Sequence, residues 1–165
     1  GPGAAYLHIL GDVIRTTLAT QPGRLRLLHS NRTQMMDAVR TGLAHLGVAV
    51  LDVAPNDLVV VPVATYPNVL LVADSHRLAR RRTVRLANLA GEQLIVPPPG
   101  KTHRARLESA LHAADVPFAI AVETDSWPLT VHFTGLGVGL AIVTGCITPP
   151  PGVTAVRITD LPTVT

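Results

Sequence analysis

The sequence contains one cysteine, few aromatic residues and few charged residues, and each shortage excludes a class of protein. The single cysteine, Cys146, can form neither an internal disulfide bond nor a cysteine-based zinc site. Of the 165 residues, 47% are hydrophobic and 15% are charged, which is typical of a globular chain with a hydrophobic core. No apolar run reaches the ~18 residues of a membrane span, and the N-terminus lacks a signal-peptide pattern. We therefore expect a cytoplasmic protein without a membrane partner.

The positive charge of the chain is concentrated in one short stretch. The formal net charge is +3 and the isoelectric point is about 9.8, values that permit binding to nucleic acid. Much of the excess lies in Arg77, Arg80, Arg81, Arg82 and Arg85, with no aromatic residue interleaved among them. This pattern favours a solvated connector over a nucleic-acid interface.

The first half of the chain has the pattern of helix, strand, helix and three further strands. Apolar residues recur every three or four positions over residues 4–20 and again in a helix that follows Ser30 and Asn31, either of which is expected to cap it. The residues expected on the buried faces of these helices are Tyr6, Leu10, Val13, Ile14 and Leu18, then Met36, Val39, Leu43 and Leu46. Apolar and β-branched runs predict strands at residues 25–28, 48–53, 58–63 and 69–73.

The second half of the chain alternates strands with helices. The predicted helical segments are a short turn at residues 86–89 and longer helices at 103–114 and 126–136. The predicted strands cover residues 94–96, 118–122, 140–143 and 154–158. Leu107 and Leu111 mark the inner face of the helix at 103–114. Such alternation predicts a largely parallel sheet with helices on both faces.

Gly100, Lys101 and Thr102 resemble the end of a phosphate-binding loop between a strand and a helix. The full motif requires a glycine five positions before Gly100, and that position holds Ile95, so nucleotide hydrolysis is not supported. Two interpretations stay open. The start of the helix carries partial positive charge and could hold an anion or a polar ligand group, or the prolines before Gly100 form a stiff turn whose polar residues face water.

Other motifs with possible chemistry have simpler structural interpretations. Gly135, Gly137 and Gly139 follow a helix and precede a strand, the reverse of a dinucleotide-binding fingerprint, so they are expected to end the helix and permit close packing. No histidine pair has metal-ligand spacing and no serine stands in a nucleophile elbow, so neither a metal nor a catalytic residue is expected. Cys146 is expected to be a structural thiol.

Asp125, Ser126 and Trp127 lie at a predicted junction between a strand and a helix. Asp125 or Ser126 is expected to cap that helix. Trp127 is the only tryptophan in the chain. Its indole ring could line a ligand site or fill the core, and the sequence leaves both possibilities open.

Two segments resemble the sensing domain of LysR-type transcriptional regulators. The segment VRLANLAGEQLIV at residues 84–96, preceded by His76, resembles a family pattern in which HPLA leads to DLAGEPLI. The segment GLGVGLAIVTG at residues 135–145 resembles the family element GLGIALLP. Arg77 stands where the family has proline, and Asn88 stands where it has aspartate. The match extends over nearly the whole chain.

The resemblance implies an α/β fold like that of type 2 periplasmic binding proteins, with two Rossmann-like subdomains joined by two crossover strands. The subdomains would comprise residues 1–65 plus 146–165, and residues 66–145. A small-molecule effector would bind in the cleft between them, and helix starts with Lys101 and Arg32 nearby favour an anion. No cofactor or metal is implied. The resemblance predicts these effector-binding residues: Ala4, Ser30, Asn31, Arg32, Ala64, Thr65, Pro99, Gly100, Lys101, Thr102, Asp125, Ser126 and Trp127.

The resemblance also implies a function and partners. The chain would be the ligand-sensing regulatory domain of a DNA-binding transcriptional regulator, and DNA would be read by a winged helix-turn-helix that is absent from this chain. The first strand of the sensing domain and its last helix are also expected to fall outside it. Homodimers or tetramers would form through residues 6–18 with 25–28 and, on the partner, residues 107–114 with 118–122. The alternatives are a transporter's solute-binding protein and an enzyme on the same fold.

Overall fold

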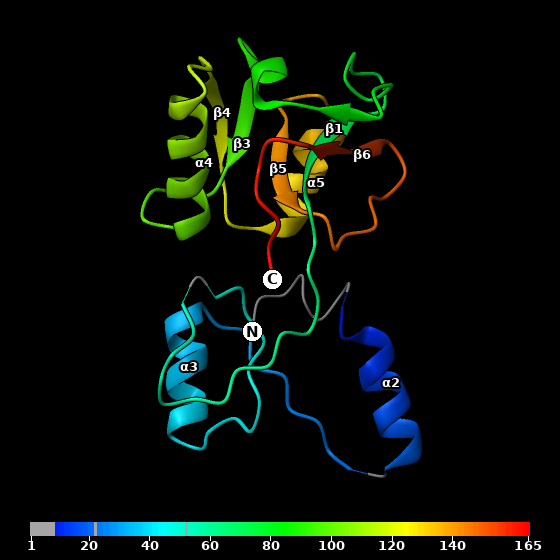
Figure 1. The fold of residues 1–165 in the computed structure, drawn as a ribbon. Coiled ribbons are helices and arrows are strands. Elements are labelled where there is room, and N and C mark those ends of the chain that lie inside the picture. Colours follow the sequence, from blue (N-terminus) through cyan, green and yellow to red (C-terminus); the bar gives the residue numbers. More distant parts are fainter. Residues whose placement is uncertain (1–8, 22, 52) are drawn as a thin grey trace. The chain divides into compact units, whose positions relative to one another are not determined.

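The computed structural model describes residues 9–21, 23–51 and 53–165. The contacts between residues divide the chain into two units. Unit 1 comprises residues 1–64 together with Thr165, and unit 2 comprises residues 65–164. Figure 1 shows the helices and strands of each unit.

Two helices form the regular structure of unit 1 within its described residues. They are α2 (Gly11–Thr20) and α3 (Arg32–Arg40). Asn31 caps α3 through a reciprocal pair of hydrogen bonds: its side chain accepts from the backbone N–H of Gln34 at 2.9 Å, and its own backbone N–H donates to the Gln34 side chain at 3.2 Å. The predicted cap is therefore confirmed, and such a cap contributes about 1 kcal/mol to helix stability.

The predicted buried faces of these helices are confirmed only in part: Ile14, Met36 and Val39 are half-buried, and none of the predicted residues that the structure describes is fully buried. No residue of α2 is buried, and Val13 on this helix is 60% exposed. Helix α3 ends at Arg40, buries Met35, and leaves the leucines at 43 and 46 exposed beyond its end. Hydrophobic periodicity identifies one face of a helix, but only a packing partner can bury that face. Residues 4–8 of the first predicted helix lie outside the described residues.

The strands predicted at residues 25–28, 48–53 and 58–63 are also wrong. None of these runs forms a strand in the part of unit 1 that the structure describes. Val53 is 81% exposed and Val59 is 95% exposed. β-Branched residues favour an extended backbone, but a strand also requires a hydrogen-bonded neighbour, and the described residues provide none for these runs.

Unit 2 is built around a four-stranded sheet and a two-stranded sheet. The four-stranded sheet has the order β2-β6-β1-β5 and comprises β1 (Asn68–Ala73), β2 (Thr83–Val84), β5 (Ala141–Thr144) and β6 (Val153–Ile158). The two-stranded sheet comprises β3 (Gln93–Val96) and β4 (Ala119–Glu123), which run parallel. A parallel bridge between Leu94 and Leu140 joins β3 to the residue before β5.

The direction of the strands differs from the predicted, largely parallel sheet. Strand β1 is antiparallel to both of its neighbours, β5 and β6, while β2 is parallel to β6. The arrangement of unit 2 is therefore mixed. An alternating hydrophobic pattern shows which side chains are buried, but it carries no information on the direction of the neighbouring strand.

The position of strand β6 affects how the chain is divided into subdomains. The family resemblance groups residues 146–165 with the first subdomain. In the structure, β6 lies between β1 and β2 in the sheet of unit 2, and residues 65–164 form one unit. The boundary near residue 65 is similar in both divisions, and the assignment of residues 146–164 differs.

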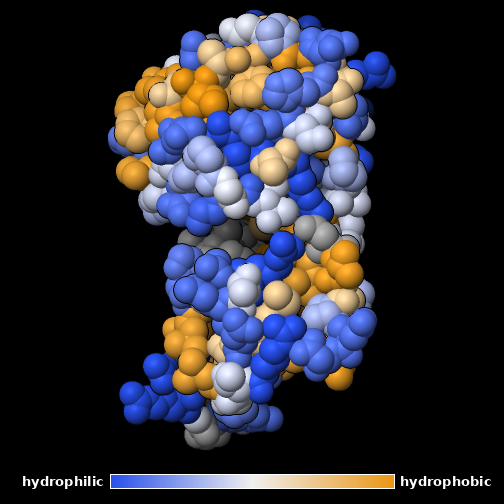
Figure 2. Space-filling model, turned by 90° about the vertical axis from the view of Figure 1, so that its left-hand side faces the viewer, coloured by the Kyte–Doolittle hydropathy of each residue, from blue (hydrophilic) through white to orange (hydrophobic). Residues whose placement is uncertain are grey.

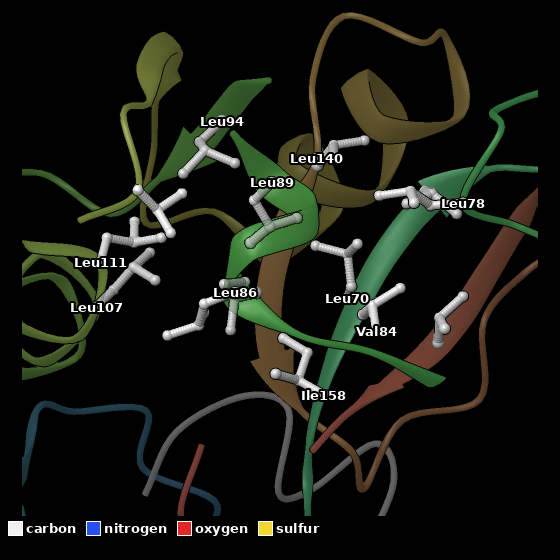
Figure 3. Packing of buried hydrophobic residues seen from close by; sticks show 14 of the residues in the cluster. Leu70, Leu78, Val84, Leu86, Leu89, Leu94, Leu107, Leu111, Leu140 and Ile158 are labelled. Carbon is white, nitrogen blue, oxygen red and sulfur yellow. The ribbon is translucent and has the colours of Figure 1, made fainter. Parts of the chain in front are cut away.

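Helices cover both faces of the sheets in unit 2, as the alternation of elements predicts. Leu107 and Leu111 of α4 (Thr102–Ala113) and two leucines of η1 (Leu86–Leu89) pack into a large buried cluster. Residues of α5 (Trp127–Gly135) pack against a second cluster. Figure 3 shows the first cluster, to which Leu94 of β3 and Leu140, the residue before β5, contribute together with the leucines of α4 and η1.

Alternation along the strands assigns their side chains to these two clusters. Leu70 and Val72 belong to the first cluster, and Leu71 between them belongs to the second. Leu94 and Val96 on β3 likewise flank Ile95. Because successive side chains of a strand point to opposite faces, this continuous apolar pattern requires cover on both sides. Each fully buried leucine contributes about 1.5–3 kcal/mol. The elements predicted for residues 66–158 are confirmed within a few residues of their ends.

Candidate functional site

Two loops of unit 2 leave the sheet at the same edge. Residues 97–101 follow β3, and residues 124–126 follow β4. Val96 and Glu123, the last residues of these parallel strands, are partners in the sheet register. The backbone N–H of Thr124 donates to the Val96 carbonyl at 2.9 Å, which extends the pairing to the start of the second loop. Loops that follow the carboxyl ends of parallel strands are a common place for ligand sites.

An ion pair connects the two loops. Lys101 Nζ lies 3.1 Å from Asp125 Oδ2, and the two side chains are 49% and 64% exposed. The structure thus brings together two residues that were predicted separately for the effector site. An exposed pair of this kind contributes only about 0–1 kcal/mol, because water competes for both charges. A ligand carrying a matching charge could replace either partner at little cost.

The helices that begin at these loops lack side-chain caps. Lys101 is the N-cap residue of α4 and Ser126 is that of α5, and neither side chain accepts a hydrogen bond from its helix. The prediction that Asp125 or Ser126 caps α5 is therefore wrong. Instead, the backbone N–H of Ser126 donates to the Thr124 hydroxyl at 3.1 Å before the helix begins. Two helix starts with partial positive charge thus belong to the loops that Lys101 and Asp125 join.

The start of α4 is anchored by His103. Its Nε2 lies 2.8 Å from the backbone oxygen of Ile142 on β5. A carbonyl oxygen only accepts hydrogen bonds, so Nε2 carries the proton. This contact holds the first turn of α4 against the sheet and so fixes the position of Lys101 at the preceding N-cap.

Arg104 holds the first loop to the end of β4. Its side chain is 7% exposed, and its Nε donates to Glu108 Oε1 at 2.6 Å. Its Nη1 donates to the Pro97 carbonyl at 2.9 Å and to Glu123 Oε1 at 3.0 Å. The hydrogen bond with Glu108 is the main cause of a raised pKa for the guanidinium, although burial opposes it. Arg104 therefore stays charged and positions the loop.

Arg104 was not predicted from the sequence to be a positioning residue. The spacing of Arg104 and Glu108, four residues apart on a helix, was the available signal for one of its contacts. Its contacts with Pro97 and Glu123 join segments distant in sequence, so no local pattern contains them. Thr124 was missed for a similar reason, since its role depends on the geometry of the turn before α5.

Trp127 packs against the core. Its half-buried side chain lies against the second buried cluster, which contains Leu71, Ile95, Ala141 and Val153. This placement favours the interpretation that the indole ring fills the core behind the second loop. Gly100 has a φ of +84°, a conformation that glycine adopts without strain, and this permits the turn before Lys101. Pro99 and Thr102 are exposed in the same segment.

The other predicted site residues lie outside these two loops. Ser30 and Arg32 are half-buried beside the cap of α3, and the Asn31 side chain is used in that cap. Ala64 is half-buried at the end of unit 1, and Thr65 is exposed at the start of unit 2. Ala4 lies outside the described residues. The structure therefore brings together the predicted residues of unit 2 that follow β3 and β4.

Cys146 has the environment of a structural thiol. It is half-buried, and burial raises the pKa of its thiol group. Its Sγ lies 3.8 Å from the Thr144 carbonyl, a weak contact within the same turn. A raised pKa lowers the thiolate fraction at neutral pH and so lowers nucleophilicity. Within the described residues, no three His, Cys, Asp or Glu side chains are grouped to hold a metal ion.

The described part of the chain contains no helix that is long and hydrophobic enough to cross a bilayer.

Comparison with known proteins gives one family and a set of related structures. Residues 2–164 match the family described as the LysR substrate binding domain. A curated relative, the regulatory protein NocR of Agrobacterium tumefaciens (strain T37), is 27% identical over 141 residues, which are 85% of this chain and 47% of NocR. The chain therefore spans about half the length of the curated relatives it matches.

Solved structures share the fold at low sequence identity. The regulatory domain of Synechocystis PCC6803 CcmR, in complex with 2-PG, is 15% identical with a TM-score of 0.78, over 98% of this chain and 83% of that one. The BenM effector binding domain with its effector benzoate is 17% identical with a TM-score of 0.80, over 96% and 75% of the two chains. The predicted fold, like that of type 2 periplasmic binding proteins, is confirmed.

Proposed function

Because the chain belongs to the LysR substrate binding domain family, we propose that it senses a small molecule for a transcriptional regulator. The single observation that carries the site proposal is the Lys101–Asp125 ion pair, which joins two loops at the carboxyl ends of adjacent parallel strands. The proposed effector contacts in unit 2 come from these loops: Pro99, Gly100, Lys101, Thr102, Asp125 and Ser126, with Trp127 behind them.

The proposed effector is a small carboxylate. Lys101 supplies a half-exposed positive charge, and two uncapped helix starts add partial positive charge beside it. BenM, which has the same fold, binds benzoate, and benzoate is a carboxylate. A carboxylate effector would replace Asp125 as the partner of Lys101. Asp125 would then be free to accept hydrogen bonds from other groups of the effector.

The proposed mechanism is a shift between two states without bond chemistry. An effector changes the balance of two conformations only to the extent that it binds one of them more tightly. The loop after β3 is held by Arg104 and His103, whereas the Lys101–Asp125 contact is weak and exposed. Effector binding would therefore favour the state in which the Lys101–Asp125 contact is replaced. Domains of this family bind ligands as parts of regulators, and we propose no catalytic step.

The proposed site also includes residues outside these two loops. Ser30, Asn31, Arg32, Ala64 and Thr65 remain proposals of the family resemblance, as does Ala4. Arg32 at the start of α3 is the cation among them. Arg32→Ala is therefore the variant that tests this part of the proposal.

A thermal-shift screen of small carboxylates, with benzoate as the first probe, tests the proposal. A ligand at 100 times its dissociation constant stabilises the fold by about 2.7 kcal/mol. Lys101→Ala should remove the shift produced by a hit, and Asp125→Asn should alter it. Arg15→Ala is the matched control, because it removes an exposed cation from α2 and should leave the shift unchanged. A hit whose shift survives both Lys101→Ala and Arg32→Ala would show that the proposed pocket is wrong.

The partners of the full-length protein are proposals of the same kind. We propose that a DNA-reading segment in the full-length protein responds to the sensing domain in the cytoplasm. We also propose that sensing domains associate as dimers or tetramers through the segments predicted from the sequence. In unit 2 these segments are α4 and β4.

A further inference from the structure

Five exposed arginines gather around the edge strand β2 of unit 2. We call this group the arginine edge, and its members are Arg80, Arg81, Arg82, Arg85 and Arg157. In the part of the chain that the structure describes, none of the five forms an ion pair with a carboxylate. The nearby Arg77 differs, because its Nη2 lies 2.6 Å from Glu92 Oε1. Within the described residues, no ion pair therefore offsets the positive charge of the arginine edge.

The alternation of the chain places part of this charge on one face. Val84 and Leu86 are buried, whereas Thr83 and Arg85 beside them are exposed, as are Arg81 and Arg82 before the strand. Because Thr83 and Val84 form β2 and the backbone at Arg85 is extended, Thr83 and Arg85 share the side opposite Val84. Thr83 is also the register partner of Arg157 on β6. The pairing thus adds a third exposed residue to this side, from a distant part of the sequence.

A shallow groove of about 400 Å³ lies beside β2. Its lining residues are Arg81, Thr83, Val84, Arg85, Asn88 and Thr159. No carboxylate is among them. The nearest acid along the chain is Asp160, whose carboxylate accepts from the backbone N–H of Leu86 at 3.0 and 3.1 Å. The side-chain oxygen of Asn88 accepts from the Arg85 N–H at 2.9 Å, and its amide nitrogen carries the donors. Apart from Val84, the groove is therefore lined by cations and neutral donors.

This combination is suited to phosphate. The planar guanidinium group binds phosphate oxygens through two parallel hydrogen bonds, and hydroxyl and amide donors complete such contacts. Three arginines of the edge lie outside the groove lining, so the charge continues beyond the space for one phosphate group. The segment from Arg81 to Arg85 extends at most about 13 Å at the rise of a strand. Duplex DNA presents roughly eight phosphates over that length.

We propose that the arginine edge binds the phosphate backbone of duplex DNA without reading its sequence. The contact is separate from the proposed effector site, because no member of the edge belongs to the loops after β3 and β4. It would add affinity to whatever DNA-reading segment the full-length protein carries. The competing explanation is that these charges keep the exposed edge of β2 from pairing with other chains.

Binding of the 165-residue chain to a labelled 20-base-pair duplex of arbitrary sequence, measured by fluorescence anisotropy over a salt series, tests the proposal. The variant is Arg81→Gln with Arg85→Gln. The control is Arg24→Gln with Arg26→Gln, which removes the same charge from exposed positions in unit 1. Each lost phosphate contact should reduce the slope of log K against log salt by about 0.9, so the variant should lose about 1.8 and the control nothing.

A second variant distinguishes an effect of lost charge from an effect of lost folding. Arg81→Lys with Arg85→Lys keeps both charges and loses the planar fork, so most of the salt slope should return. Equal slopes for the glutamine variant and the Arg24/Arg26 control would overturn the proposal. It would also be overturned if the wild-type chain bound polyglutamate and not the duplex, which would indicate an acidic protein partner.

Discussion

Arg104 is the residue on which the geometry of the proposed effector site depends most directly. Its guanidinium donates to Pro97 in one loop, to Glu123 at the end of β4, and to Glu108 on its own helix. A buried arginine is tolerated only when hydrogen-bonded acceptors surround it. The side chain therefore has both a structural and a positioning role.

Arg104→Met is expected to destabilise the chain by about 2–3 kcal/mol, because charge-assisted hydrogen bonds are lost and the Pro97 carbonyl loses a donor. Urea unfolding followed by circular dichroism measures the change. Arg106→Met, at an exposed position of the same helix, is the control and should cost less than about 1 kcal/mol. Equal losses of stability for Arg104→Met and Arg106→Met would show that the buried contacts of Arg104 do not account for its effect.

Asp57 in unit 1 predicts a dependence on pH. The hydrogen bond from Arg40 is the main cause of a lowered pKa for this carboxyl group, with Arg40 Nε 2.6 Å from Asp57 Oδ2. A folded-state pKa below the unfolded value stabilises the fold at pH values above the unfolded pKa, near 3.9 for aspartate, and this contribution is lost as pH falls through the folded value. Asp57→Asn should therefore remove part of the acid sensitivity of unit 1. An NMR titration that gives Asp57 an ordinary pKa would contradict the ion pair.

At the scale of elements, the turn between α5 and β5 explains the glycine-rich segment. Gly137 has a φ of +73°, and its N–H donates to the Thr134 carbonyl at 2.9 Å. The next N–H, of Val138, donates to the Phe133 carbonyl at 3.0 Å. These bonds end the helix in a Schellman motif. The expected roles of helix termination and close packing are both present in this segment.

Gly139→Ala should destabilise the chain by about 1–3 kcal/mol, because a methyl group would overpack the sheet. A Cβ at this position would lie 3.0 Å from the backbone oxygen of Gln93, which cannot move away without disturbing β3. Gly135→Ala is the matched control, since its Cβ would meet only a Val153 methyl group at 3.4 Å and a helix favours alanine. Thermal unfolding of both variants should show a loss for Gly139→Ala alone.

At the scale of the whole molecule, the proposed association depends on surfaces such as that of β4. This strand pairs with β3 on one side, and Ile120, its second residue, is 39% exposed. Figure 2 shows the side of the chain on which α4 lies, where hydrophobic areas of the surface alternate with hydrophilic ones. A hydrophobic strand with an open edge is expected to be covered by a partner.

Analytical ultracentrifugation of the chain should therefore detect a dimer at high concentration. Ile120→Asp should raise its dissociation constant by roughly tenfold or more, since a charge buried at an interface costs over 1.4 kcal/mol. Leu129→Asp, at a similarly exposed position on α5, is the control and should leave association unchanged. Detection of monomer alone at high concentration would count against the proposed dimer.

Much of unit 2 could be predicted from the sequence, and little of unit 1. In unit 2, strands such as β1 and helices such as α4 have strong local patterns that packing reinforces. In unit 1, the capping contact of Asn31 was predictable because its hydrogen bonds join residues within a stretch of four. The strand predictions at residues 48–63 failed because propensity was the only signal, and no neighbouring strand supports it in the described residues.

The amino-acid sequence by itself determined the family, the type and order of the elements in unit 2 apart from the short strand β2, and the inner face of α4 at Leu107 and Leu111. These properties depend on interactions within a few residues, or on motifs such as residues 84–96. Only the tertiary structure decided that β6 pairs antiparallel with β1, that Lys101 meets Asp125, and that Arg104 joins two strand ends. The physical reason is that these contacts join segments far apart in the chain, so their geometry exists only once the sheet has formed.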